Sequence, residues 1–279
     1  MKFTAPAKIN LYLEVIRRRK DGYHDIETIM QTVSLCDELT FSRRKEGVLL
    51  KCSRPELANE QNLVFRAAKL LIDRLNLKTG VKITLKKRIP AGAGLGGGSS
   101  DAAAALRGLL KFWNRKLNEK ELAGMAASLG ADVPFFLSGG TAQATGIGER
   151  VKPLPNLPKT WFLLVNPRVH VPTASVYKKL QFPLTNKQKI NKIRRLISGG
   201  FPPEPWENYL FNRLEEVVLP RVGAIREIKN VLGRLGARGV MSGSGSTVFA
   251  PVPTATRGEV LRKKLRKFPW DVWLVSSTC

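Results

Sequence analysis

A glycine-rich segment at residues 90–101 is the part of the sequence best suited to chemistry. It consists of Pro-Ala-Gly-Ala-Gly-Leu-Gly-Gly-Gly-Ser-Ser-Asp, and the good helix formers of residues 102–113 follow it. Glycines let the backbone approach an anion without side-chain clashes. The N–H groups and the positive dipole end of a helix N-terminus favour a phosphate. The segment therefore predicts a nucleotide-phosphate loop, with Ser99, Ser100 and Asp101 as candidate N-cap residues and the serines also suited to contact phosphate or Mg²⁺.

Two familiar phosphate-binding motifs do not account for this loop. Gly92, Gly94 and Gly97 have the spacing of the dinucleotide fingerprint, which any glycine-rich string can match by chance. The segment before the loop, residues 81–85, alternates with lysines instead of forming a buried apolar run, and no acidic residue ends a strand about 20 residues further on. A Walker A motif fails because no Gly-Lys-Ser/Thr follows. A phosphate loop of a third kind is favoured, and a purely structural loop is the alternative.

Four further side chains suit catalysis or recognition, but residue types alone leave plainer roles open. Asp132 lies in an apolar stretch and fits a helix N-cap at least as well as a proton acceptor. Lys8 lies in an alternating segment, where a solvent-facing lysine is the favoured interpretation. Tyr23 and His24 follow a turn; they could stack on a base and bind its edge, or be a turn-flanking tyrosine and a surface histidine.

The pattern along the chain predicts strands mixed with helices. The expected strands are residues 8–16, 29–35, 38–41, 81–85, 161–165 and 247–250. The expected helices are residues 62–75, 102–113, 119–129 and 222–235. Strands that alternate in polarity indicate an α+β arrangement with one-sided sheets. Residues 152–158, rich in proline, are the candidate linker, and residues 242–246 form a second glycine loop.

Composition excludes several classes of protein. Of 279 residues, 43% are hydrophobic, which excludes overall disorder. No apolar run approaches the roughly 20 residues of a membrane-spanning helix, and the start lacks the apolar segment of a secretory signal. The three cysteines are widely spaced and there are two histidines, which argues against a disulfide framework and a zinc site. We therefore expect a cytoplasmic protein with no metal-binding residues of its own.

The net charge of +25 raises the possibility of a nucleic-acid partner. The basic residues occur in short clusters spread over the chain, such as residues 17–20, 43–45, 86–88, 187–195 and 262–267. Because no RNA-binding motif accompanies them, a solvated basic surface is favoured, and a field that attracts nucleotides is the intermediate interpretation. Few signals indicate a large obligate interface, so we expect a monomer or a weak homodimer.

Four stretches of the sequence together resemble the GHMP kinases, the family of galactokinase and the homoserine, mevalonate and phosphomevalonate kinases. These stretches are residues 5–11 with 19–24, residues 62–64 with the glycine loop, residues 130–136 with 146–149, and residues 241–246. The first and third point to the branch whose substrate carries a cytidine diphosphate. The resemblance implies a two-domain α+β fold, with a ribosomal protein S5 domain 2-like N-terminal domain (1–155) and an α/β-sandwich C-terminal domain (156–279). ATP and substrate would lie in the cleft between them.

The resemblance also implies an activity and its residues. The expected reaction is ATP-dependent phosphorylation of the 2-hydroxyl of a cytidine-diphosphate-linked methylerythritol, in the non-mevalonate isoprenoid pathway. Lys8 and Asp132 would be catalytic, with Asp132 as the base and the Lys8 ammonium beside it and the acceptor oxygen. The ATP-binding residues would be Asn62, Lys87, Pro90, Ala91, Gly92, Ala93, Gly94, Leu95, Gly96, Gly97, Gly98, Ser99 and Ser100. The substrate-binding residues would be Asn10, Tyr23, His24, Asp132 and Tyr177.

Several alternatives stay open at this point. Mg²⁺ is expected to arrive with the nucleotide, since no acidic pair is evident as its protein ligand. Tyr177 could instead be a core tyrosine. A homoserine- or mevalonate-type GHMP kinase is the nearest competing function, and the stretch Asp-Gly-Tyr-His at residues 21–24 argues against it because only a nucleotide-bearing substrate needs a stacking aromatic. An RNA-binding protein with the S5-like fold is a further, weaker alternative.

Overall fold

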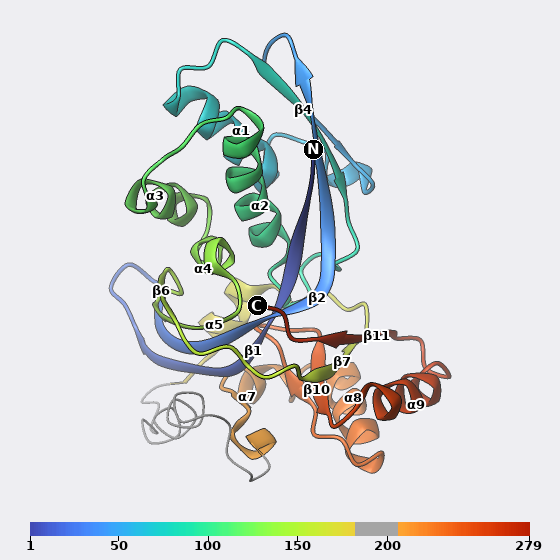
Figure 1. The fold of residues 1–279 in the computed structure, drawn as a ribbon. Helices are drawn as coiled ribbons and strands as arrows, with labels where there is room; N and C mark the ends of the chain where they lie inside the picture. Colours follow the sequence, from blue (N-terminus) through green and yellow to red (C-terminus); the bar gives the residue numbers. More distant parts are fainter. Residues whose placement is uncertain (182–205) are drawn as a thin grey trace. The chain divides into compact units, whose positions relative to one another are not determined.

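The computed structural model describes residues 1–181 and 206–279, and its chain divides into two compact units (Figure 1). The first unit contains Met1–Ala7, Leu35–Ala91 and Gly96–Ser138. The second unit contains Lys8–Ser34, Gly92–Leu95 and Gly139–Cys279. The basic cluster predicted at residues 187–195 lies outside the described residues. The predicted domain boundary at residue 155 stays a prediction, and the candidate linker at 152–158 lies in the second unit.

Two long strands contribute residues to both units. Strand β1 spans Lys2–Arg18 and strand β2 spans His24–Arg44. The sequence predicts β1 as an alternating, half-exposed strand and β2 as two separate strands. Those two details are wrong. Strand β2 is continuous, and every residue of β1 from Ala7 to Val15 is buried, so that only the ends of the strand are exposed. A strand covered on both sides keeps no polar face for solvent, so polar residues within it must find partners inside the protein.

The first unit packs helices against a small sheet. Its further elements are β3 (Val48–Cys52), η1 (Pro55–Leu57), α1 (Leu63–Arg74), β4 (Gly80–Lys86), α2 (Gly97–Phe112), α3 (Glu119–Leu129) and α4 (Val133–Ser138). Strand β4 pairs antiparallel with β2, with Phe41 opposite Ile83, and parallel with β3. Helices α1, α2, α3 and α4 pack on one another. The predictions of α1, α3 and a half-exposed β4 are confirmed.

The second unit contains a four-stranded antiparallel sheet in the order β11-β7-β10-β9. Its elements are β5 (Thr141–Gly146), β6 (Arg150–Pro153), β7 (Trp161–Asn166), α5 (Thr173–Lys178), η2 (Trp206–Tyr209), β8 (Phe211–Asn212), α7 (Glu215–Val218), α8 (Gly223–Arg234), β9 (Val240–Met241), β10 (Val248–Val252), α9 (Ala255–Leu265) and β11 (Asp271–Ser276). Helices α8 and α9 pack on this sheet. The predictions of β7, α8 and β10 are confirmed within a residue or two.

A buried ion pair ties β1 to the segment after β8 within the second unit. The Arg213 guanidinium donates to both carboxylate oxygens of Glu14, at 2.6 and 2.9 Å. The side chains of the pair are 11% and 6% exposed. Such a bidentate pair compensates each charge for the loss of water.

None of the described helices is long and apolar enough to cross a membrane.

Helix α2 approaches strand β2 so closely that its facing residue has no room for a side chain. A Cβ placed on Gly108 would lie 2.5 Å from Cε2 of Phe41 and 3.1 Å from Cδ2 of Phe3. These two rings also contact each other, with centroids 5.6 Å apart. The closeness of this contact therefore depends on glycine at position 108.

We predict that Gly108→Ala lowers the free energy of unfolding by about 1–3 kcal/mol, because the added methyl overpacks the contact with Phe41. Gly124→Ala in helix α3 is the matched control, since a Cβ there meets nothing within 4 Å. That control should gain about 0.5–1 kcal/mol from helix propensity. Urea denaturation followed by circular dichroism measures both, and equal effects at the two positions would contradict the packing argument.

Candidate active site

The glycine-rich segment runs directly into helix α2. Gly96 is the N-cap residue in the left-handed conformation (φ 68°), and no side chain caps the helix there. Gly92 and Gly94 also have positive φ values, 64° and 78°, which residues with a Cβ rarely adopt. The first N–H groups of a helix have no acceptor within it. The start of α2 therefore fits a phosphate group, as the sequence predicts.

The predicted capping role of Ser99, Ser100 and Asp101 is wrong. The left-handed Gly96 lets the helix begin at Gly97, so these three residues lie inside its first turns. Ser100 and Asp101 are buried there, at 1% and 2% exposure. Their polar groups therefore face the protein interior.

The Lys87 ammonium lies between two carboxylates. Its Nζ donates to Asp101 Oδ2 at 2.6 Å and to Asp37 Oδ2, and the Lys87 side chain is 5% exposed. Asp37 also accepts from the backbone N–H groups of Ile89, at 2.9 Å, and Arg88. Burial opposes the positive charge, but the two carboxylates outweigh it and raise the pKa of Lys87. The three side chains fasten the segment after β4 to β2 and to the start of α2.

One lysine shared by two buried carboxylates leaves a negative charge without a full partner. Asp101 Oδ1 and the neighbouring Ser100 Oγ are buried without a hydrogen-bond partner. Burial raises the pKa of Asp101 to about 7, because it outweighs the opposing pull of Lys87, and the Asp37 carboxylate adds to the rise. Asp101 therefore takes up a proton close to neutral pH.

Two other predicted residues of the first unit stand at helix starts. Asn62 is the N-cap of α1: its Oδ1 accepts from Val64 N at 2.9 Å and its Nδ2 donates to Leu57 O at 2.8 Å. Asp132 is half-buried and immediately precedes α4. The cap fixes Asn62 firmly, and its predicted place beside adenine stays a prediction.

The predicted catalytic lysine of the second unit is buried in a polar chain of contacts. Lys8 is 4% exposed, which corrects the solvent-facing role that its pattern favours. Its Nζ donates to Asn10 Oδ1 at 2.6 Å, Asn10 Nδ2 donates to Thr28 Oγ1 at 2.8 Å, and Thr28 Oγ1 donates to Tyr12 O at 2.6 Å. Lys8 and Asn10 thus share one face of β1, as predicted. The chain of bonds holds the amine in a defined position.

The two glycine loops contact each other within the second unit. The Ser242 hydroxyl donates to Gly94 O at 2.9 Å, Thr247 N donates to Ala93 O at 3.2 Å, and Lys8 N donates to Leu95 O at 2.9 Å. A Cβ on Gly94 would collide with the Ser242 carbonyl, so glycine is required there. The second glycine loop, residues 242–246, therefore packs against the first.

Two of the predicted cytosine-binding residues, His24 and Tyr177, contact each other in the second unit. The His24 ring lies 5.2 Å from that of Tyr177, centroid to centroid. His24 is 8% exposed, and burial, with the nearby Arg18 charge, lowers its pKa. A neutral imidazole offers one donor and one acceptor, as a pyrimidine edge requires. Tyr177 also packs against the core, as its alternative interpretation expects, and its predicted place beside cytosine stays a prediction.

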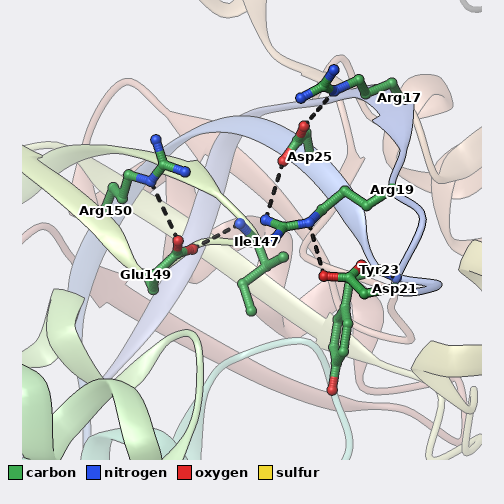
Figure 2. Close-up of polar contacts among 8 residues, drawn as sticks. All are labelled: Arg17, Arg19, Asp21, Tyr23, Asp25, Ile147, Glu149 and Arg150. Carbon is green, nitrogen blue, oxygen red and sulfur yellow. Dashed lines mark hydrogen bonds and ion pairs between the residues drawn. The ribbon is translucent and has the colours of Figure 1, made fainter.

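Two residues of this constellation have no signal in the sequence. Asp37 and Thr28 come from distant segments, and only the fold brings them to Lys87 and Asn10. Asp21 is different: an Asp before Gly22 at a turn is an Asx-turn signal. It contributes to a network of ion pairs around the β1–β2 turn (Figure 2).

No group of three or more His, Cys, Asp or Glu side chains able to hold a metal occurs in residues 1–181 and 206–279. A surface cavity of about 340 Å³ in the second unit contains none of the predicted site residues. It is lined by Leu210, Phe211, Asn212, Glu215, Glu216, Leu219, Pro220, Lys229, Arg238, Gly239 and Val240. We assign the site from the side-chain chemistry, because this cavity lacks the glycine loop and the buried lysine.

Comparison with known proteins first defines the class. Residues 62–140 match the GHMP kinases N terminal domain and residues 203–269 match GHMP kinases C terminal. A homoserine kinase structure from Cytophaga hutchinsonii is similar over 99% of this chain and 94% of its own, with a TM-score of 0.77 at 20% identity. The fold is therefore the GHMP kinase fold, and the predicted α+β class is confirmed.

More similar proteins define the branch. A crystal structure of 4-(cytidine 5'-diphospho)-2C-methyl-D-erythritol kinase covers 100% of both chains, with a TM-score of 0.85 at 35% identity. The 4-diphosphocytidyl-2-C-methyl-D-erythritol kinase of Syntrophus aciditrophicus is 44% identical over 282 residues, covering 99% of each chain. This chain belongs to the 4-diphosphocytidyl-2-C-methyl-D-erythritol kinase family of the GHMP kinases.

The raised pKa of Asp101 predicts that the stability of the protein depends on pH. A folded-state pKa near 7, above the ordinary value of 3.8, means that the folded protein binds more protons between these values. The free energy of unfolding should therefore fall as pH rises from about 4 to about 7, by up to about 1.4 kcal/mol per pH unit. The pKa of Lys87 is raised above 10.5, so its charge does not titrate in this window.

Asp101→Asn, which keeps the shape of the protonated acid, should remove this contribution. As pH rises from about 4 to about 7, the free energy of unfolding of the variant should increase relative to that of the wild type. Urea denaturation at several pH values measures this difference. Asp271→Asn, in an exposed ion pair with Arg168, is the control. A pH-independent difference for Asp101→Asn would show that the carboxyl does not titrate there.

Proposed function

We propose that this chain transfers the γ-phosphoryl group of ATP to the 2-hydroxyl of 4-diphosphocytidyl-2-C-methyl-D-erythritol. The observation that carries the proposal is the buried amine of Lys8, held by Asn10 at 2.6 Å, in a chain that matches kinases of that name over nearly its full length. The same unit presents His24 and Tyr177 as neighbouring rings, which suits a substrate that carries a base.

ATP is the proposed phosphoryl donor. Its phosphates would be held by residues 90–100, where positive-φ glycines lead into the uncapped start of α2. Asn62 and Lys87 would border the nucleotide. Lys87 would act by holding Asp101, and with it the first turns of α2, in place. Mg²⁺ would arrive with the nucleotide and reduce the charge of the phosphates.

Asp132 and Lys8 are the proposed catalytic residues. Phosphoryl transfer needs a group that accepts the hydroxyl proton, and the half-buried Asp132 carboxylate has the right chemistry. The acceptor alcohol is tertiary and weakly acidic, so an ammonium such as that of Lys8 would stabilise the developing alkoxide. Asn10, Tyr23, His24 and Tyr177 would bind the substrate.

Coupled ADP release tests the proposal directly. Purified protein with ATP and Mg²⁺ is given 4-diphosphocytidyl-2-C-methyl-D-erythritol, homoserine or mevalonate in separate assays. Turnover with the cytidyl substrate alone is the expected result. Turnover with homoserine or mevalonate instead would reject the cytidine site, and no turnover with any of them would reject the activity and make RNA binding the next assay. Cytoplasmic location and a monomeric or weakly dimeric state stay predictions.

Asp132→Asn should lower kcat by at least about 100-fold, because an amide accepts no proton. The KM for ATP should stay within about twofold, since the amide keeps the size of the carboxyl. Asp73→Asn, on the exposed side of α1, is the matched control and should leave both constants unchanged. Near-normal turnover of Asp132→Asn in steady-state assays would reject the assignment of Asp132 as the base.

Lys8→Met should lower kcat by at least about 100-fold while the KM for ATP changes little, because the ammonium acts on charge that develops in the transition state. Methionine keeps most of the length of the side chain. Lys2→Met is the control on the same strand, where the lysine is 62% exposed and pairs with Glu38. A loss confined to ATP affinity would move Lys8 from the catalytic to the nucleotide-binding residues.

A further inference from the structure

We propose that Arg19 is a positioning residue of the substrate site: with Asp21, it fixes the turn that presents the ring of Tyr23. The proposal rests on the function proposed above, in which Tyr23 stacks on the cytosine of the substrate. It concerns residues that touch no substrate themselves. Their contacts all lie within the second unit, and Figure 2 draws the ion pairs of Arg19 with Asp21 and Asp25.

The backbone of Arg19 closes the turn between β1 and β2. Arg19 N donates to Tyr23 O at 2.8 Å, and Gly22 N donates to Arg19 O at 3.2 Å. Gly22 has φ +87°, a value that favours glycine. The turn therefore begins and ends on Arg19 and Tyr23.

The side chain of Arg19 closes the same turn a second time. Its Nε donates to Asp21 Oδ2 at 3.1 Å, while Asp21 Oδ1 accepts from Tyr23 N at 3.0 Å. One carboxylate thus joins the arginine to the backbone of the tyrosine. Arg19 Nη1 also lies 3.5 Å from Asp25 Oδ1, while Asp25 Oδ2 accepts from Arg17 Nε at 2.6 Å. Figure 2 shows Arg19 between the two carboxylates.

Tyr23 needs this support because packing does not hold its ring. The residue is 61% exposed, whereas the next residue, His24, is 8% exposed. The N–H and C=O groups of Tyr23 are both used by the turn. A fixed backbone reduces the freedom that the ring must lose when a base stacks on it, which strengthens binding without any new contact.

The strand that leaves the turn is also held. Ile26 of β2 pairs with Gly146 of β5. The following β5–β6 turn is closed by Glu149, whose Oε2 accepts from Ile147 N at 2.7 Å (Figure 2). With β2 fixed from Ile26 onward, the freedom that remains lies in residues 19–23, where Arg19 acts.

The test compares Arg19→Ala with Arg17→Ala. Both variants remove one positive charge next to Asp25, but only Arg19 contacts the turn. We expect Arg19→Ala to raise the KM for the cytidyl substrate about 3- to 10-fold, with kcat and the KM for ATP unchanged. Arg17→Ala should stay within about twofold on all three constants. Arg19→Lys keeps the charge but not the planar fork, and should behave like Arg19→Ala.

A double-mutant cycle with Tyr23→Ala separates positioning from other effects. Tyr23→Ala alone should raise the KM, and adding Arg19→Ala to it should raise the KM no further, because there is no ring left to present. Calorimetric binding of cytidine diphosphate to each variant gives the same comparison without turnover. Thermal melts check that every variant folds.

The outcomes distinguish this proposal from the function on which it rests. Equal effects of Arg19→Ala and Arg17→Ala, or additive effects of Arg19→Ala and Tyr23→Ala, would overturn the positioning role while the cytidine site stands. Rescue by Arg19→Lys would reduce the role of Arg19 to charge and also overturn it. If Tyr23→Ala changes neither KM nor cytidine diphosphate binding, Tyr23 is not part of the cytidine site, and both proposals about it fall.

Discussion

A helix start that must serve a phosphate cannot also be closed by its own side chains. Helix α2, the proposed phosphate site, has a left-handed glycine at its N-cap and no capping side chain. Its stability must then come from elsewhere. In the first unit, the Lys87 ion pairs with Asp37 and Asp101 hold the helix start from inside. The loop upstream is held through its carbonyls in the second unit: Gly94 O accepts from the Ser242 hydroxyl and Leu95 O accepts from Lys8 N.

This internal support places three charged groups in the protein interior, those of Lys87, Asp37 and Asp101. Two carboxylates share the Lys87 ammonium, and burial, with a smaller contribution from the Asp37 charge, raises the pKa of Asp101 to about 7. A protonated Asp101 would make the group of three electrically neutral, which a buried site favours. The Lys8 ammonium also lies in the interior, where its contacts include a hydrogen bond of 2.6 Å to the amide oxygen of Asn10.

The parts of the fold that could be predicted from sequence are those set by local patterns. Helix α3 spans Glu119–Leu129, as predicted, because Asn118 caps it and Gly130 ends it. The polar residues of strand β1 predict a solvent-exposed face, which the fold instead buries. The spacing of Asp101 after the glycines predicts a cap for a similar reason, but its ion-pair partner Lys87, 14 residues away, holds it inside the protein.

The candidate site divides in the same way. The glycine loop and the Asp-Gly-Tyr-His turn are contiguous and identify themselves in the sequence. The partners of Lys87 and Asn10 come instead from distant segments: Asp37 for Lys87 and Thr28 for Asn10. Such partners need only one polar group at one place in space, so no local pattern marks them.

The β1–β2 turn adds one step to this argument. An exposed aromatic ring is accessible to a base, but it adds little to the binding affinity if its backbone is free. Ordering the turn would then offset part of the stacking energy. A buried aromatic is ordered but cannot be reached. The turn separates the two requirements, because Arg19 and Asp21 order the backbone of Tyr23 with surface ion pairs and leave its ring in solvent. Single surface ion pairs contribute little to folding stability. Here their value lies in orientation, and that accounts for the concentration of charged residues on a turn that buries almost nothing.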